Sequence, residues 1–134
     1  MLEELDKINK YLNKNNMKKK ENKRVFISGK ITGEPIWECI NKFTKAESNI
    51  IRRLKLDMRL DMGENGDVVF NPPFLAGIHF GIRHDEAMEI CFKVLETCTH
   101  IYMLKDWELS RGAKMEHDMA KVHGLEIIYE SELK

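Results

Sequence analysis

Four short apolar runs alternate with longer stretches of helical periodicity, and this alternation constrains the fold more than any other feature of the chain. The runs are Val25–Ser28, Val68–Phe70, His100–Leu104 and Glu126–Tyr129. Each gap between them is long enough for a helix, and apolar side chains recur within the gaps at the spacing of a helix face. Strands joined in this way form right-handed crossovers within one sheet. We therefore expect an α/β three-layer domain with four or five mostly parallel strands.

Three helices are expected between these strands. The first is indicated by apolar residues from Trp37 to Leu54, before a glycine-containing turn at 63–66. The second spans Ala87–Cys98, and the third begins at Ser110 and ends near His123. Residues 71–83 carry two prolines at their start and are expected to form a loop.

Residues 1–23 are expected to form a separate segment before a domain at 24–134. Apolar residues recur at helical spacing over residues 1–12, whereas residues 14–23 are polar and basic. This basic stretch is interpreted either as a solvated spacer or as a contact for a phosphate-rich partner. Residues 1–24 carry eight basic and four acidic side chains, so the rest of the chain is modestly acidic.

The whole chain has a net charge of +0, which argues against a nucleic-acid coat or a membrane-surface protein. Its most apolar stretch, residues 68–82, is too short to span a bilayer, and acidic residues lie where a signal peptide would be basic. Three cysteines without a CxxC pair favour a reducing compartment over a disulfide framework. We expect a cytoplasmic protein with neither a membrane nor a nucleic acid as its partner.

Ligands of parallel α/β sheets bind at the carboxyl ends of the strands. A ligand site is therefore expected in the loops at 28–35, 71–83 and 105–112. In the last of these, Ser110 is a good helix N-cap, and Gly112 and Ala113 keep the first turn free of bulk. Free amides at a helix N-terminus bind anions. Glu116 follows within two turns and would place a carboxylate beside that anion site. The alternative interpretation is a plain capped helix with a surface glutamate.

The other two loops are weaker candidates. The glycines of Ser28–Gly33 would let a flat ligand lie against the backbone, although the segment matches neither G-x-G-x-x-G nor a P-loop and also suits an ordinary turn. Asn71 ends the second strand, and Trp107 is interpreted as either a packing or a ligand-contacting residue. The spacing of the histidines matches no metal site, so we expect no metal and no cofactor.

Three segments occur together in an order that resembles a known superfamily: Phe26–Gly33, Val68–Pro72 and Cys98–Glu116. This order is similar to that of the nucleoside 2-deoxyribosyltransferase-like superfamily. The closest resemblance is to a small uncharacterised family of bacteria and phages with a W-E-x-S-x-G-A-x-x-E motif, here Trp107–Glu116. The resemblance covers residues 24–130. It implies a flavodoxin-like or Rossmann-like fold and a homodimer, or higher homo-oligomer, with sites near the subunit interface.

The resemblance also implies a reaction. Glu116 matches the nucleophile that attacks the anomeric carbon of a nucleoside and displaces its base, in the manner of retaining glycosidases. Ser110 stands where relatives acting on free nucleosides tend to carry a carboxylate, which implies a nucleoside 5′-monophosphate as the ligand. Hydrolysis of the N-glycosidic bond, or deoxyribosyl transfer, follows. The expected substrate-binding residues are Ser28, Gly29, Lys30, Gly33, Asn71, Trp107, Ser110, Arg111, Gly112 and Ala113.

Two departures from the superfamily pattern keep other functions open. Cys91 stands where an aspartate usually helps to orient sugar and nucleophile. Without that helper the protein would be a slow hydrolase, would use Asp106 or Asp85 instead, or would only bind its ligand. Lys30 replaces a small residue or proline and is a candidate phosphate cation. The alternatives are a non-catalytic module that binds or sequesters a nucleotide, and a structural protein whose helix at 1–12 packs on a partner.

Overall fold

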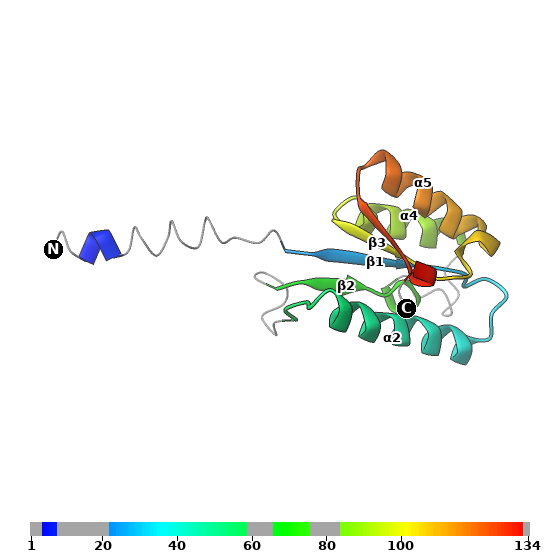
Figure 1. Ribbon diagram of the computed structural model, residues 1–134. Helices are drawn as coiled ribbons and strands as arrows, with labels where there is room; N and C mark the ends of the chain where they lie inside the picture. Colours follow the sequence, from blue (N-terminus) through cyan, green and yellow to red (C-terminus); the bar gives the residue numbers. More distant parts are fainter. Residues whose placement is uncertain (1–3, 8–21, 59–65, 76–83, 133–134) are drawn as a thin grey trace.

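The computed structural model describes residues 4–7, 22–58, 66–75 and 84–132, and its core is a parallel sheet between two layers of helices (Figure 1). The strands are β1 (Arg24–Ser28), β2 (Val68–Phe70), β3 (His100–Met103) and β4 (Glu126–Tyr129). Their spatial order is β2-β1-β3-β4, and all pairs are parallel. The helices are α2 (Ile36–Arg53), α3 (Pro72–Leu75), α4 (His84–Leu95) and α5 (Arg111–Val122), with 3-10 turns η2 (Trp107–Leu109) and η3 (Glu130–Glu132). The predicted α/β class and parallel sheet are confirmed.

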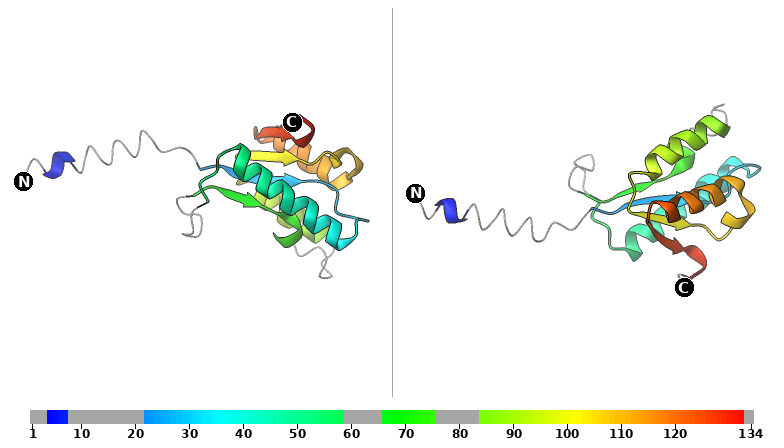
Figure 2. Two further views of the ribbon diagram at one scale, coloured as in Figure 1. Left: turned by 60° about the horizontal axis from the view of Figure 1, so that its bottom comes forward. Right: turned by 90° about the horizontal axis from the view of Figure 1, so that it is seen from above.

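Helix α2 covers one face of the sheet, and α4 and α5 cover the other (Figure 2). The alternation of side chains along β1 divides the core between these two faces. Val25 and Ile27 pack with α2, whereas Phe26 packs with α4 and α5. Ser28, the last residue of β1, falls on the α4/α5 side by the same alternation. A polar side chain is thereby placed within a buried layer.

Helix boundaries differ from the predictions in three places. Helix α2 ends at Arg53. The residues of this helix that pack on the sheet are smaller than Trp37, and Trp37 itself is 73% exposed. Helix α4 begins at His84 and ends at Leu95, three residues before the predicted start and the predicted end. Residues 72–75 form a short helix rather than a loop, because proline is well suited to a first helical turn in which its missing N–H is not needed.

Some predictions concern residues that the structure describes only in part. The N-terminal helix is described only at residues 4–7, which are helical. The linker at 14–23, the turn at 63–66 and the loop at 71–83 lie largely outside the described residues. Among the described helices, none combines the length and the apolar character needed to cross a bilayer.

The strand order reverses between β1 and β3, the position at which open parallel sheets form a ligand-binding crevice. The chain passes from β1 to β2 on one side and then crosses to β3 on the other side of β1. In open parallel sheets this change of direction leaves the loops at the carboxyl ends of the two strands apart, and ligands bind there. The loops concerned here are the β1 loop (residues 29–35) and the β3 loop (residues 104–110).

Gly29 begins the β1 loop and lies directly against Leu104. A Cβ at position 29 would lie 2.5 Å from Leu104 Cδ1 and 2.9 Å from Leu104 Cβ. Replacing Gly29 by alanine is therefore expected to lower the free energy of unfolding by about 1–3 kcal/mol. Urea denaturation measures this loss. The double variant Gly29→Ala/Leu104→Ala should lose less than the sum of the single variants, because the clash is gone. Additive losses would contradict this contact as the reason for glycine.

Candidate functional site

Glu116 is a buried carboxyl on the sheet-facing side of α5. The buried residues of this helix are Gly112, Ala113, Glu116, His117 and Ala120, which places Glu116 on the face toward β1. Its side chain is 6% exposed. Ser28 Oγ donates a hydrogen bond to Glu116 Oε1 at 2.7 Å. The last residue of β1 and the second turn of α5, 88 positions apart in the sequence, thus meet in the crevice.

The surroundings of Glu116 favour its neutral form. Burial raises the pKa of Glu116 to about 8, and the hydrogen bond from Ser28 opposes part of that rise. Burial likewise raises the pKa of the Cys91 thiol to about 12, with a further contribution from the negative charge of Glu116. At neutral pH the cavity therefore holds a mostly protonated carboxyl next to a neutral thiol.

Glu116 and Cys91 line one open cavity, to which all three predicted loops contribute. Its walls are formed by Gly29, Ile31, Thr32, Pro72, Ala87, Met88, Cys91, Ser110, Gly112, Ala113 and Glu116. The inner space is about 40 Å³, which is room for a few water molecules. Only one group of a larger ligand would reach the Glu116 carboxyl, and the rest would occupy the mouth of the cavity.

The N-terminus of α5 forms another wall of this cavity. Ser110 is the predicted N-cap, and its Oγ accepts a hydrogen bond from the amide of Ala113 at 3.1 Å. The amides of Arg111 and Gly112 have no acceptor within the described residues. The Ser110 hydroxyl keeps its own hydrogen for donation, because a hydroxyl accepts and donates at once. Two amides and one hydroxyl are thus available to an anion.

The remaining predicted residues have separate places. Arg111 is exposed on the first turn of α5, where it is available as a countercharge. Gly33 is exposed in the β1 loop with a φ of +83°, which explains why glycine stands there. The backbone N–H of Lys30 donates to Asp106 Oδ1 at 3.1 Å, so this residue is tied to the β3 loop.

The cavity lining lacks Asn71 and Trp107, as it also lacks the predicted residues Ser28, Lys30, Gly33 and Arg111. Asn71 is buried on the α2 side of the sheet, where its Nδ2 donates to Glu47 Oε2 at 3.4 Å. Trp107 stacks on the ring of His117 with the ring centroids 4.3 Å apart, and Tyr129 packs beside both rings. The packing interpretation therefore describes the position of Trp107.

The two proposed substitutes for a helper aspartate also lie elsewhere. The Asp106 carboxylate is bound to Lys30 and to the Lys42 ammonium, on the α2 side. Asp85 is exposed on the first turn of α4. Among the described lining residues, Glu116 is the one carboxyl. No three His, Cys, Asp or Glu side chains in the described parts of the chain are grouped as a metal ion would require.

Residues 23–129 match the family described as a domain of unknown function, DUF4406. The chain belongs to this family. The match begins one residue before β1 and ends with the last residue of β4, so the family unit is the sheet with its helices. No curated protein and no solved structure matches the chain.

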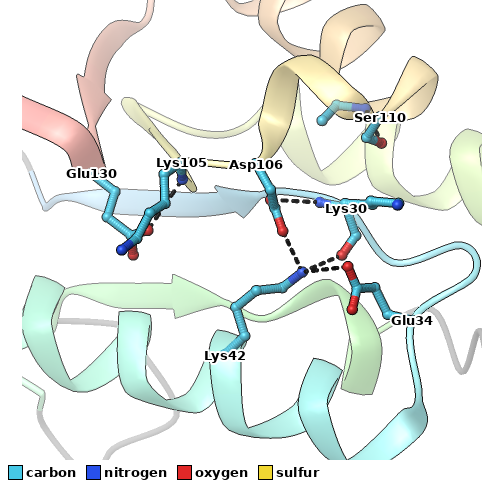
Figure 3. A network of polar contacts seen from close by, with 8 residues as sticks. Lys30, Glu34, Lys42, Lys105, Asp106, Ser110 and Glu130 are labelled. Atoms are coloured by element: carbon cyan, nitrogen blue, oxygen red, sulfur yellow. Dashed lines mark hydrogen bonds and ion pairs between the residues drawn. The ribbon is translucent and has the colours of Figure 1, made fainter.

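Sequence reasoning missed two parts of the family domain that bear on the site. Apolar wall residues such as Met88 and Pro72 carry no chemical signal and are identified only once α3 and α4 are placed. Lys42, one of 22 basic residues in the chain, gave no reason to be singled out. Its contacts join the β1 and β3 loops (Figure 3).

Proposed function

We propose that the cavity around Glu116 binds a nucleoside 5′-monophosphate and hydrolyses its N-glycosidic bond. The observation that carries this proposal is the presence, in one cavity, of a buried carboxyl and a helix N-terminus whose first amides have no acceptor among the described residues. The amides suit the phosphate, and the carboxyl suits the cationic centre that develops at the sugar carbon. The resemblance to the nucleoside 2-deoxyribosyltransferase-like superfamily supports the same assignment.

In the proposed reaction, Glu116 acts in its ionised form. The C1′–N bond breaks with its electron pair going to the base, while a Glu116 oxygen bonds to C1′. Water then attacks C1′ and releases the carboxylate. The hydroxyl of this water stays on the sugar phosphate, and its proton goes to the base. If a second base attacks instead of water, the same intermediate gives deoxyribosyl transfer.

The remaining groups would hold the substrate in place. Ser28 fixes Glu116 Oε1, whereas Oε2 has no partner among the described residues and is the oxygen proposed to attack. The Ser110 hydroxyl and the amides of Arg111 and Gly112 would bind the phosphate. Ile31, which is half-buried, and Thr32, which is exposed, also line the cavity and would contact the base or sugar.

A panel of deoxyribo- and ribonucleoside monophosphates tests this function. Wild-type protein is incubated with each compound, and chromatography measures the free base. Release is expected from at least one monophosphate and only with Glu116 present. Glu108→Gln, which changes an exposed glutamate of η2, is the matched control and should retain activity. Equal release by wild type and Glu116→Gln would contradict the assignment of the nucleophile.

A second candidate is a module that binds a nucleotide without turning it over. It is favoured by Cys91, a neutral thiol next to Glu116 where a helper carboxylate would be needed. With a pKa near 8, only about one tenth of Glu116 is ionised at pH 7. Thermal-shift titration with the same panel separates the candidates, because a binder would be stabilised by a nucleotide and release no base.

A further inference from the structure

Lys42 of α2 forms a bridge between two loops that follow different strands (Figure 3). Its Nζ donates to the carbonyl oxygen of Lys30 at 2.6 Å and to Asp106 Oδ2 at 2.6 Å. Glu34 Oε1 lies 3.9 Å from the same ammonium. Lys30 and Glu34 belong to the β1 loop, and Asp106 belongs to the β3 loop. One ammonium group therefore contacts both loops.

Asp106 completes the bridge from the other side. The amide of Leu104 still donates to Ser28 O at 2.8 Å, as in the parallel ladder of β1 and β3. The carbonyl of Leu104, however, accepts from Trp107 N in the turn that starts η2. Lys30 N donates instead to Asp106 Oδ1, so a carboxylate takes the place of a backbone acceptor. Both the N–H and the C=O of Lys30 are thus held by side chains from other segments.

This bridge lies next to the cavity without lining it. Lys30 is flanked by Gly29 and Ile31, which form one wall, and Asp106 precedes Ser110 and Gly112, which form another. The Lys42 and Asp106 side chains are only about one quarter exposed, at 25% and 23%. An ion pair on an open surface contributes little, but this pair also binds the N–H and the C=O of Lys30, at 3.1 and 2.6 Å. It is suited to fixing the separation of the two walls.

We propose that Lys42 and Asp106 are positioning residues that hold the β1 loop in register with the phosphate-binding end of α5. The proposal rests on the proposed function, since it concerns the same cavity. It adds one residue of α2 and one residue of the β3 loop, which would act on the ligand through Lys30 and its neighbours. Loss of either residue would leave Glu116 and Ser28 in place and release the wall formed by Gly29, Ile31 and Thr32.

Three variants and a control test this role. Lys42→Met removes the ammonium, Asp106→Asn keeps an acceptor for Lys30 N while losing the acceptor for Lys42, and Asp106→Ala loses both. Lys45→Met, one turn along α2 and exposed, is the matched control for lost charge. Hydrogen–deuterium exchange is measured over residues 29–35 in the protein without ligand. Exchange there is expected to be at least about tenfold faster in Lys42→Met and Asp106→Ala, and unchanged in Lys45→Met.

The same variants are then assayed for nucleotide binding and base release. We expect kcat/KM to fall about tenfold in Lys42→Met and Asp106→Ala, because misplaced ligand-contacting groups lower the rate without being lost. Lys42→Arg should restore part of the activity. The fall in kcat/KM should be similar for a nucleoside and its monophosphate. A fall confined to the monophosphate would mean that Lys42 contacts the phosphate directly, and it would overturn the positioning role.

The two proposals fail in different ways. If wild type neither binds nor cleaves any nucleotide, the proposed function fails, and the bridge is judged on exchange alone. If exchange over residues 29–35 is the same in Lys42→Met and wild type, the positioning role is overturned whatever the nucleotide assay shows. If exchange rises but kcat/KM is unchanged, the bridge orders the loop without serving the site, and the proposal is again overturned.

Discussion

Glu116→Gln is expected to make the protein more stable at neutral pH while removing its proposed activity. The wild-type carboxyl is buried, and its pKa is raised from 4.5 to about 8. In the unfolded chain it would ionise near its ordinary value, so the unfolded state gains stability relative to the folded state as pH rises above 4.5. At pH 7 this amounts to on the order of 3 kcal/mol. Glutamine has no proton to lose and can still accept the hydrogen bond from Ser28.

The contribution of Glu116 to the free energy of unfolding should fall as pH rises. A raised pKa in the folded state gives stability that is complete below pH 4.5 and is lost as pH rises toward 8. Urea denaturation at pH 5 and pH 8 should therefore show that the free energy of unfolding falls less between these pH values in Glu116→Gln than in wild type. Glu108→Gln, on an exposed residue, should follow wild type. If the free energy of unfolding changed equally between pH 5 and pH 8 in the two glutamine variants, Glu116 would not be a buried acid.

The same variant should lower base release about 1000-fold, because glutamine cannot form the ester with C1′. A gain of stability together with a loss of activity is expected when a functional group is buried at a cost in stability. A purely structural carboxyl would give the gain in stability and no change in base release. The two measurements on one protein therefore separate function from packing.

Much of this fold follows from local signals in the sequence. The apolar run at Val25–Ser28 is buried on both faces, as a central parallel strand requires, and β1 is that strand. Helix α5 begins after Ser110 and ends before Gly124 because a side-chain cap and a residue with a φ of +71° mark its ends. Such signals depend on a few residues that are neighbours in the chain, which explains why they can be recognised in the sequence.

The parts that sequence reasoning missed depend on distant contacts. Trp37 fits the apolar periodicity of α2, but smaller residues of that helix pack on the sheet, and Trp37 is exposed. Ser28 is predicted to contact the ligand, and the structure places its hydroxyl on Glu116, a relation that exists only once β1 and α5 are packed together. The raised pKa of Glu116 arises from that burial and has no signature in the spacing of residues.

Ser110→Asp is expected to weaken binding of a nucleoside 5′-monophosphate at least tenfold, which corresponds to about 1.4 kcal/mol. The proposed phosphate lies against the Ser110 hydroxyl and the amides of Arg111 and Gly112, which have no acceptor in the described parts of the chain, so the new carboxylate would face another anion. A charge-assisted hydrogen bond of the kind lost is worth about 1.5–3 kcal/mol. Aspartate is itself a good N-cap, so α5 should remain intact.

Ser110→Asn is the matched control, because asparagine also caps helices and has nearly the same size without the charge. Titration of a monophosphate and its nucleoside against wild type and both variants gives the comparison. Only the aspartate variant should lose affinity strongly, and only for the monophosphate, because the nucleoside brings no anion to the helix N-terminus. Equal losses for both ligands would mean that the phosphate binds elsewhere. The assignment of Ser110 as the residue that selects phosphorylated ligands would then be wrong, while the role of Glu116 would still rest on its own variant.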